Sequence, residues 1–285
     1  MTAPRRILIL VPHPDDEVVG CGIAARREAL CGKHVLALYL TTGVPERKLL
    51  WPWQRRHYAA RIAARRAEAE AAAELLGIMP AGFQDVPARM LKSHLASSLA
   101  RIQATLAAER IEELWTPAFE GGHQDHDATN LLASRLRQRL PVIEFAEYHL
   151  AGGQVASQRF LALCGDERHL VLTAAEAALK RQALALYRSE RRNLAHVRSE
   201  RECLRPLAPY DYARAPHAGR LFYARFQWVP FRHPRVDFDP PARVYATLAR
   251  FAAETSASSE VPTGDRKSTR LNSSHPSKSR MPSSA

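Results

Sequence analysis

The stretch that decides the fold is "RILILVPHPDDEVVGCGIAARREALCG", residues 6–32, near the start of the chain. Residues 7–11 form a short apolar run that ends at Pro12, a pattern typical of a buried strand. After the polar turn, apolar residues recur at helical spacing until Gly32, and glycine commonly follows the last turn of a helix. This stretch therefore predicts a buried strand, a polar loop and a helix in direct succession.

The alternation of strand and helix continues along the chain. We expect further strands over 34–43, 111–117 and 141–150, and helices over 56–77, 92–110 and 127–140. Beyond residue 153 the pattern weakens to a helix over 173–190, a late strand over 219–231 and a helix over 242–257. Such alternation is typical of a mostly parallel sheet with helices on both faces. The predicted fold class is α/β and Rossmann-like, with the active site at the carboxyl ends of the strands.

We expect one catalytic domain over residues 1–238, a peripheral extension over 239–264 and a separate tail over 265–285. The tail, "DRKSTRLNSSHPSKSRMPSSA", resembles a translated sequencing adaptor. Its Ser-rich, apolar-poor composition is typical of disordered segments, so it is excluded from functional reasoning. It carries five basic residues and one acid, so the formal net charge of +12 falls to +8, from 36 basic and 28 acidic residues, without it.

The bulk composition is that of an ordinary globular protein, with 46% hydrophobic and 25% charged residues. The basic residues are scattered over predicted helices without interleaved aromatic residues, so no nucleic-acid partner is expected. The longest apolar runs are strand-sized, so no membrane span is expected. The four cysteines show no metal-ligand spacing, which favours reduced thiols and a cytoplasmic location. The sequence leaves the oligomeric state open.

Two polar clusters interrupt this hydrophobic scaffold at equivalent places. "HPDDE" (residues 13–17) follows the first predicted strand, and "EGGHQDHD" (residues 120–127) follows the strand that ends near Pro117. If these two strands are neighbours where the strand order reverses, both clusters meet in one crevice. His13, Asp16 and His126 are residue types that bind catalytic zinc, which usually has three protein ligands and one open position. A divalent cation also relieves the repulsion between neighbouring carboxylates.

Three further residues of these clusters are candidates for catalysis. Asp15 adjoins the predicted ligand Asp16, where it could take a proton from a water that the metal activates. His123 could stabilise a developing oxyanion or protonate a leaving nitrogen. Asp125 lies between His123 and His126 in the sequence and could fix the tautomer of one of them.

With these residues assigned, "PHPDDE" and the later "GGHQDH" resemble the motifs of the PIG-L/LmbE-like family of zinc-dependent deacetylases. The resemblance covers residues 5–231 and implies removal of an acetyl group from an N-acetylglucosamine-type sugar or glycoconjugate. It implies the same metal ligands, Asp15 as general base, and His123 supported by Asp125. It also implies that Arg65, in the "RRAE" segment, contacts the substrate, although Arg66 is an alternative.

Two other functions are compatible with parts of the sequence. A metal-dependent phosphoester hydrolase would use a carboxylate-rich site with two metal ions, for which the clusters offer few ligands. A basic polyanion-binding protein with a vestigial metal site would show steeply salt-dependent binding. Trp51 and Trp53 in "LLWPWQ" are compatible with a sugar-binding rim, since aromatic rings stack on pyranose faces, or with a loop packed on the domain edge.

Overall fold

The computed structural model describes residues 5–257. A seven-stranded sheet has the order β3-β2-β1-β4-β5-β9-β8, in which β1 to β5 are parallel and β9 and β8 are antiparallel to their neighbours. Its strands are β1 (Arg6–Val11), β2 (His34–Tyr39), β3 (Met79–Phe83), β4 (Glu113–Pro117), β5 (Val142–Phe145), β8 (Arg168–Val171) and β9 (Arg201–Pro206). A separate two-stranded hairpin pairs β6 (Tyr148–His149) with β7 (Ala156–Ser157). The predicted α/β class is confirmed.

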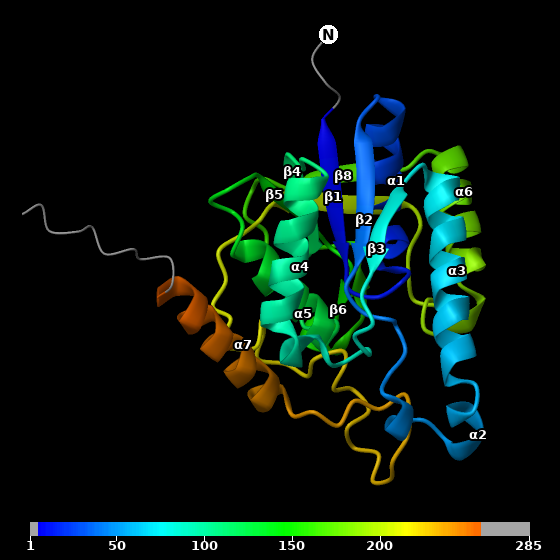
Figure 1. Ribbon diagram of the computed structural model, residues 1–285, viewed down its shortest axis with the longest axis vertical. Coiled ribbons are helices and arrows are strands. Elements are labelled where there is room, and N and C mark those ends of the chain that lie inside the picture. Colours follow the sequence, from blue (N-terminus) through cyan, green and yellow to red (C-terminus); the bar gives the residue numbers. More distant parts are fainter. Residues whose placement is uncertain (1–4, 258–285) are drawn as a thin grey trace, which may run out of the picture.

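Helices cover both faces of the sheet (Figure 1). One layer contains α1 (Asp16–Leu30), α3 (Tyr58–Leu76) and α6 (Ala174–Leu186), and the other contains α4 (Leu95–Ala108), α5 (Gln124–Ser134) and α7 (Pro241–Ala257). The short helix α2 (Pro52–Arg55) and four 3-10 turns lie in connections, over Arg47–Leu49, Leu91–Ser93, Ala151–Gly153 and Arg188–Glu190.

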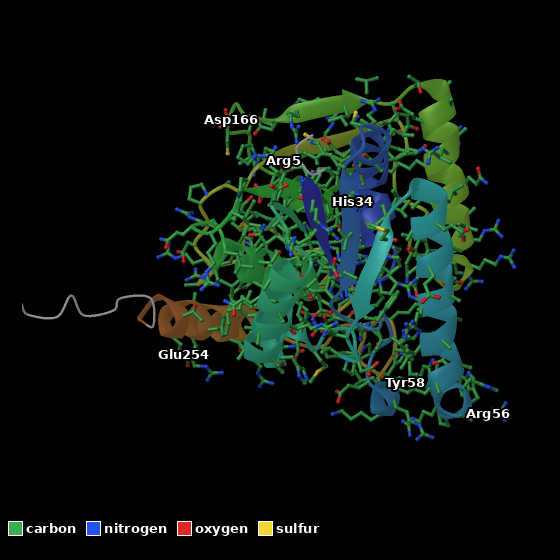
Figure 2. All side chains as sticks on the ribbon, turned by 45° about the horizontal axis from the view of Figure 1, so that its top comes forward. Arg5, His34, Arg56, Tyr58, Asp166 and Glu254 are labelled. Carbon is green, nitrogen blue, oxygen red and sulfur yellow. The ribbon has the colours of Figure 1, made fainter. Side chains whose placement is uncertain are left out.

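The first strand shows why the sequence forms this layered core. Ile7, Ile9 and Val11 face the layer of α1, α3 and α6, whereas Leu8 and Leu10 face the layer of α4, α5 and α7. Because successive side chains of a strand point to opposite faces, a strand that is covered on both faces needs a continuous apolar run. Side chains fill the space between the layers from the strand starts near Arg5 and His34 toward the opposite end near Tyr58 (Figure 2).

The strand order reverses between β1 and β4. The chain runs from β1 to β2 and β3 on one side and then returns to place β4 on the other side of β1. The register pairs Ile7 with Glu113 and Ile9 with Trp115, so the two strands end at the same edge of the sheet. Both polar clusters therefore follow neighbouring strand ends, as the sequence predicts.

The late strand predicted over residues 219–231 is wrong. This segment is a series of turns, in which the amide of Ala224 donates to Leu221 O and that of Arg225 donates to Phe222 O. Leu221 to Ala224 are buried consecutively, rather than alternately as in a half-exposed strand. The amide of Phe222 donates to Gly121 O (3.0 Å), so the segment packs over the loop that follows β4.

The sheet instead ends with β9 and β8, which the apolar pattern does not indicate. Strand β9 contains Glu202 and Arg205, and both side chains are buried in ion pairs with Lys180 and Glu144 respectively. Charged residues interrupt the apolar pattern by which a strand is recognised. The partners that allow these charges to be buried lie far away in the sequence, so the local pattern gives no sign of the burial. The short edge strand β3 was also not predicted, since it contains a proline and a glycine.

The segment after residue 238 contains α7, which matches the helix expected over 242–257. Val244, Tyr245 and Leu248 of this helix are buried in the same core as β1 and α5. The predicted tail over 265–285 lies outside the described residues. Within residues 5–257, no helix combines the length and apolar character that crossing a membrane requires.

Candidate active site

The polar clusters meet at the carboxyl ends of β1 and β4, where two helices begin. Asp16 is in the first turn of α1, and His126 is in the first turn of α5. The helix expected over 127–140 spans Gln124–Ser134 instead, so it begins almost one turn earlier and also ends earlier. Gly121 adopts φ 70°, and a Cβ atom on Gly122 would lie 2.5 Å from Tyr148 O. These two glycines let the chain turn tightly and pass the β6 backbone on its way to α5.

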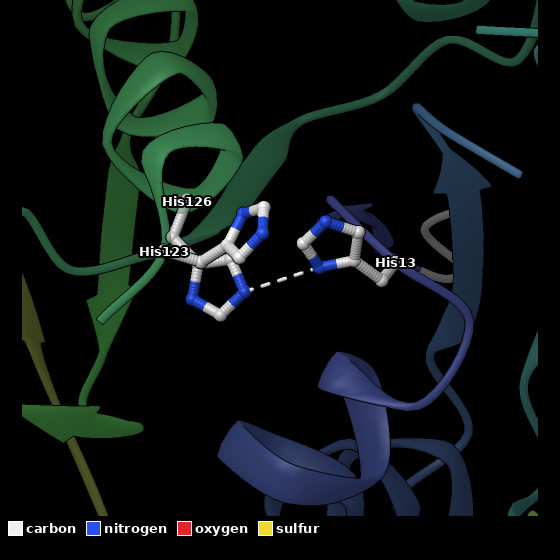
Figure 3. Close-up of side chains that lie close together, drawn as sticks. All are labelled: His13, His123 and His126. Atoms are coloured by element: carbon white, nitrogen blue, oxygen red, sulfur yellow. Dashed lines mark hydrogen bonds between the residues drawn. The ribbon is translucent and has the colours of Figure 1, made fainter. Parts of the chain in front are cut away.

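His13, Asp16 and His126 form a compact triangle of ligand atoms. Asp16 Oδ2 lies 3.0 Å from His13 Nδ1 and 3.1 Å from His126 Nε2. The two histidine nitrogens are 3.3 Å apart, along the dashed line of Figure 3. Zinc–ligand bonds of 2.0–2.2 Å in tetrahedral geometry place ligand atoms about 3.3 Å from one another. The triangle therefore has the dimensions of three ligands around one zinc-sized cation.

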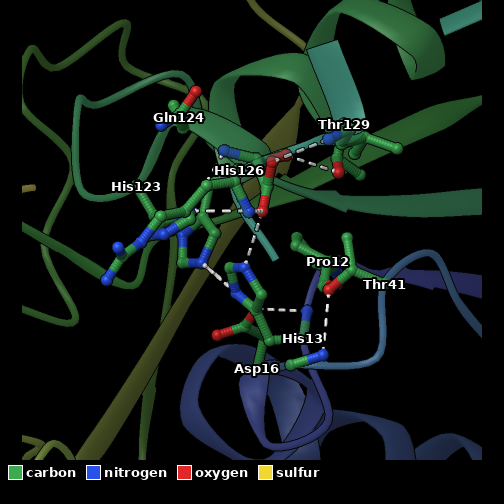
Figure 4. A network of polar contacts seen from close by, with 12 residues as sticks. Pro12, His13, Asp16, Thr41, His123, Gln124, His126 and Thr129 are labelled. Atoms are coloured by element: carbon green, nitrogen blue, oxygen red, sulfur yellow. Dashed lines mark hydrogen bonds and ion pairs between the residues drawn. The ribbon is translucent and has the colours of Figure 1, made fainter. Parts of the chain in front are cut away.

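Each histidine of the triangle presents its other ring nitrogen to a carboxylate. His13 Nε2 lies 3.0 Å from Asp125 Oδ2, and His126 Nδ1 lies 3.0 Å from Glu147 Oε2. Metal-ligating histidines commonly have such an outer carboxylate, which fixes the tautomer and makes the ligand more basic. Each of the two rings is therefore held by a carboxylate on both sides, within the network of polar contacts around His13 and His126 (Figure 4).

The electrostatics of the cluster favour a cation at its centre. Burial alone lowers the pKa of His13, but the charge of Asp16 and the hydrogen bonds of Asp125 and Asp16 raise it to about 9. Burial also lowers the pKa of His126, but the charges of Asp16 and Glu147 outweigh burial and raise this pKa well above its ordinary value. The protonated histidines compensate the carboxylates. A divalent cation would supply the same positive charge while the histidines bind as neutral ligands. The donor set therefore fits a metal ion.

Asp15 is held in an unusual backbone conformation beside the triangle. Its φ of 133° is one that residues with a side chain rarely adopt, and such strain is concentrated at functional sites. Arg65 Nη2 lies 3.2 Å from Asp15 Oδ2 and also donates to Pro14 O. The amide of Asp15 donates to Glu17 Oε2 (3.2 Å). Burial raises the pKa of the Asp15 carboxyl group, and the positive charge of Arg65 opposes that rise.

Arg65 is placed to hold Asp15 rather than to face open solvent. Only 3% of its surface is exposed, and Nη1 donates to Ser189 Oγ (3.4 Å) and lies 3.7 Å from Glu190 Oε1. Ser189 and Glu190 belong to the "LYRSE" segment after α6. Arg66 is on the exposed side of α3, where it pairs with Glu70 (3.0 Å). Of the two arginines that the sequence left open, only Arg65 reaches the site.

His123 is the residue that precedes α5, and its side chain caps that helix. Its Nδ1 accepts a hydrogen bond from the amide of Asp125 (3.1 Å), so a neutral His123 carries its proton on Nε2. Burial, together with the charge of His13, lowers the pKa of His123 well below its ordinary value. The neutral ring lies edge-on to His13, with centroids 4.3 Å apart. Nε2–H is therefore a fixed donor next to the triangle.

Asp125 and Glu147 have positions that the sequence did not specify. Asp125 was expected to orient one of its neighbouring histidines, but its closer contact is with His13; it lies 3.6 Å from His123 Nδ1. Backbone amides of Arg89 (2.5 Å) and Leu91 (3.2 Å) fix its carboxylate. Glu147 was not singled out, although it follows the end of β5 at the same edge of the sheet as the other clusters.

Aromatic side chains from separate segments lie beside His126. Tyr148 of β6 lies 5.6 Å from the ring of His126 and 4.7 Å from that of Phe222. In the connection before α3, Trp51 and Trp53 stack on each other with centroids 5.5 Å apart, and Trp53 is 59% exposed. The Trp51–Trp53 pair therefore presents flat apolar surface to solvent.

The fold and this cluster define a class of α/β proteins that carry a candidate metal site at the switch point of a mostly parallel sheet. Within that class the PIG-L resemblance is confirmed: residues 8–136 match the model of the PIG-L family, described as GlcNAc-PI de-N-acetylase. No curated protein matches the chain closely enough to count as a relative.

Solved structures support the same fold. The chain is similar to a deacetylase of the teicoplanin biosynthesis pathway, with 18% identity, a TM-score of 0.57 and coverage of 72% of this chain and 99% of that one. A zinc-inhibited form of teicoplanin deacetylase has 19% identity, a TM-score of 0.54 and coverage of 72% and 99%. The A40926 pseudoaglycone deacetylase has 20% identity, a TM-score of 0.52 and coverage of 73% and 100%.

Proposed function

We propose that this protein is a zinc-dependent hydrolase that removes the acetyl group from an N-acetylglucosamine-type sugar or glycoconjugate. The observation that carries the proposal is the triangle of His13, Asp16 and His126 with Asp15 held beside it by Arg65. The family match over residues 8–136 supports the amide-hydrolysing reaction. Similar solved structures, which are those of deacetylases, agree with it.

Bound zinc would supply Lewis acidity toward the acetyl carbonyl and the attacking water. Asp15 would accept the proton of that water and then deliver it to the leaving nitrogen, so that acetate and a free amine are released. Arg65 holds the Asp15 carboxylate in place, which favours a positioning role over direct substrate contact. His123 would donate Nε2–H to the acetyl oxygen as negative charge develops on it.

Acetate release from a panel of N-acetylglucosamine derivatives tests the proposal. Asp15→Asn should bind one zinc ion per chain like the parent protein and should lose turnover by a factor of about 10²–10⁴, because proton transfer contributes rate enhancement of that size. Asp166→Asn, on the exposed surface, is the matched control and should keep full turnover.

His13→Ala and His126→Ala should lose zinc as well as activity. The general-base assignment is wrong if Asp15→Asn stays within a few-fold of the parent turnover. The deacetylase proposal fails if no derivative in the panel releases acetate. Two zinc ions per chain would instead favour phosphoester hydrolysis.

A further inference from the structure

A concave site lies on the β6–β7 hairpin and includes none of the residues of the triangle. It has a volume of about 290 Å³ and is bordered by Arg159, Arg198 and Arg201, with Gln154 and Ser157 among its other polar residues. No acidic side chain lines it. Three arginines thus border one cavity of a size that suits a small ligand. We call this site the arginine pocket.

These three arginines differ from the arginines that support the fold. Arg27, Arg65 and Arg205 each lie within ion-pair distance of a carboxylate. Among residues 5–257, the guanidinium groups of the arginine pocket have no carboxylate within 4.0 Å. Three positive charges around one cavity, without a carboxylate beside them, favour an anion there.

The pocket is fixed to the same structural unit as the candidate active site. Ser157 pairs with Tyr148 across the hairpin, and the amide of Arg198 donates to Ser157 Oγ (3.4 Å). Tyr148 in turn lies against His126, and Glu147 precedes it. The hairpin therefore lines the arginine pocket through β7 and contacts His126 of the triangle through β6.

We propose that the arginine pocket binds a phosphate-type oxyanion. Each planar guanidinium group presents paired N–H donors that match phosphate oxygens, and three such groups suit a doubly charged ligand with several terminal oxygens. No aromatic side chain lines the pocket, so the stacking platform that single-stranded nucleic acids require is missing from it. The ligand is either free phosphate or a phosphate group carried by the acetylated substrate.

Titration calorimetry of the full chain with inorganic phosphate tests binding without any need for turnover. The parent protein should bind phosphate saturably, and Arg159→Gln/Arg198→Gln should weaken binding at least tenfold, because two charge-assisted contacts are lost. The control is Arg191→Gln/Arg192→Gln, which removes the same charge from exposed positions outside the pocket. Absence of saturable binding, or equal weakening in the control, overturns the proposal.

Deacetylation kinetics then distinguish the two sources of phosphate. If the substrate carries it, the pocket variant should raise KM for N-acetylglucosamine 6-phosphate or 1-phosphate but not for N-acetylglucosamine, and inorganic phosphate should compete. If free phosphate is the ligand, it should change the turnover of unphosphorylated N-acetylglucosamine in the parent and not in the pocket variant. This second measurement rests on the proposed deacetylase function, whereas the calorimetry does not.

Discussion

Removal of the Lys180 amino group should destabilise the protein strongly. Lys180 is in α6, and its amino group makes a hydrogen bond to α1 at a break in that helix. At Cys21 the backbone of α1 departs from helical geometry, with φ −146° and ψ 16°. An unbroken helix would join the amide of Ile23 to Val19 O. Here Lys180 Nζ donates to Val19 O (2.9 Å), and Glu202 Oε1 accepts from Ile23 N (3.0 Å). Lys180 and Glu202 also pair with each other at 2.8 Å, and both are fully buried.

The magnitude follows from the burial of both charges. Lys180→Met would keep the apolar stem but leave the Glu202 carboxylate buried with hydrogen bonds to two backbone amides and no counter-charge. Breaking a buried ion pair by removing one partner costs about 3–5 kcal/mol. Since domains are stable by only about 5–15 kcal/mol, that loss should be plain in an unfolding curve.

Arg27→Met is the matched control, since Arg27 and its partner Glu176 join the same two helices at the surface. The Arg27 side chain is 41% exposed. Exposed pairs contribute about 0–1 kcal/mol, so the control should change the free energy of unfolding by no more than that.

Urea unfolding followed by circular dichroism measures both variants. The double variant Lys180→Met/Glu202→Gln should recover part of the loss, because it no longer buries an unpaired charge. If Lys180→Met costs no more than Arg27→Met, the ion pair does not support the break in α1 and the reasoning is refuted.

Three other predictions concern two buried side chains, Glu120 and Leu248, and the outer carboxylate of Glu147. Burial raises the pKa of Glu120 from 4.5 to about 8. As pH rises, Glu120 therefore loses its proton in the unfolded state before it does so in the folded state, and the free energy of unfolding falls between pH 4.5 and about pH 8. Glu120→Gln should lack this loss, which amounts to up to about 5 kcal/mol; parallel urea curves at pH 5 and pH 8.5 measure it, and equal pH dependence in the two proteins would contradict it. Leu248→Ala should cost about 2–5 kcal/mol because Leu248 is fully buried, whereas Arg250→Ala on the exposed face of α7 should cost little; similar melting temperatures for both variants would show that α7 does not stabilise the core. Glu147→Gln should weaken zinc affinity about 10–100-fold through His126, with turnover restored at saturating zinc, and unchanged affinity in a chelator competition would argue against an outer role for Glu147.

The convergence of the two polar clusters was predictable because it depends on local patterns. The apolar run of β1, the helical spacing after it and the repeat of this unit at β4 indicate parallel strands whose carboxyl ends share an edge. His13, Asp16 and His126 follow those ends directly, so their proximity needed no knowledge of side-chain conformation.

The side chains that pair with His126, His13 and Asp15 were not predictable, because this pairing depends on contacts between distant segments. Glu147 behind His126, Asp125 behind His13 and Arg65 on Asp15 are pairs whose members lie between 21 and 112 positions apart in the sequence.

Strand β9 was not predicted for the same reason, because its burial depends on contacts with distant segments. Periodicity reports which side chains avoid water, but Glu202 and Arg205 are buried only because Lys180 and Glu144 compensate their charges. The sequence by itself determined the α/β scaffold and the place of the site. Only the tertiary structure decided how each charged side chain is paired, since burial of a charge is stable only when the fold brings its partner to it.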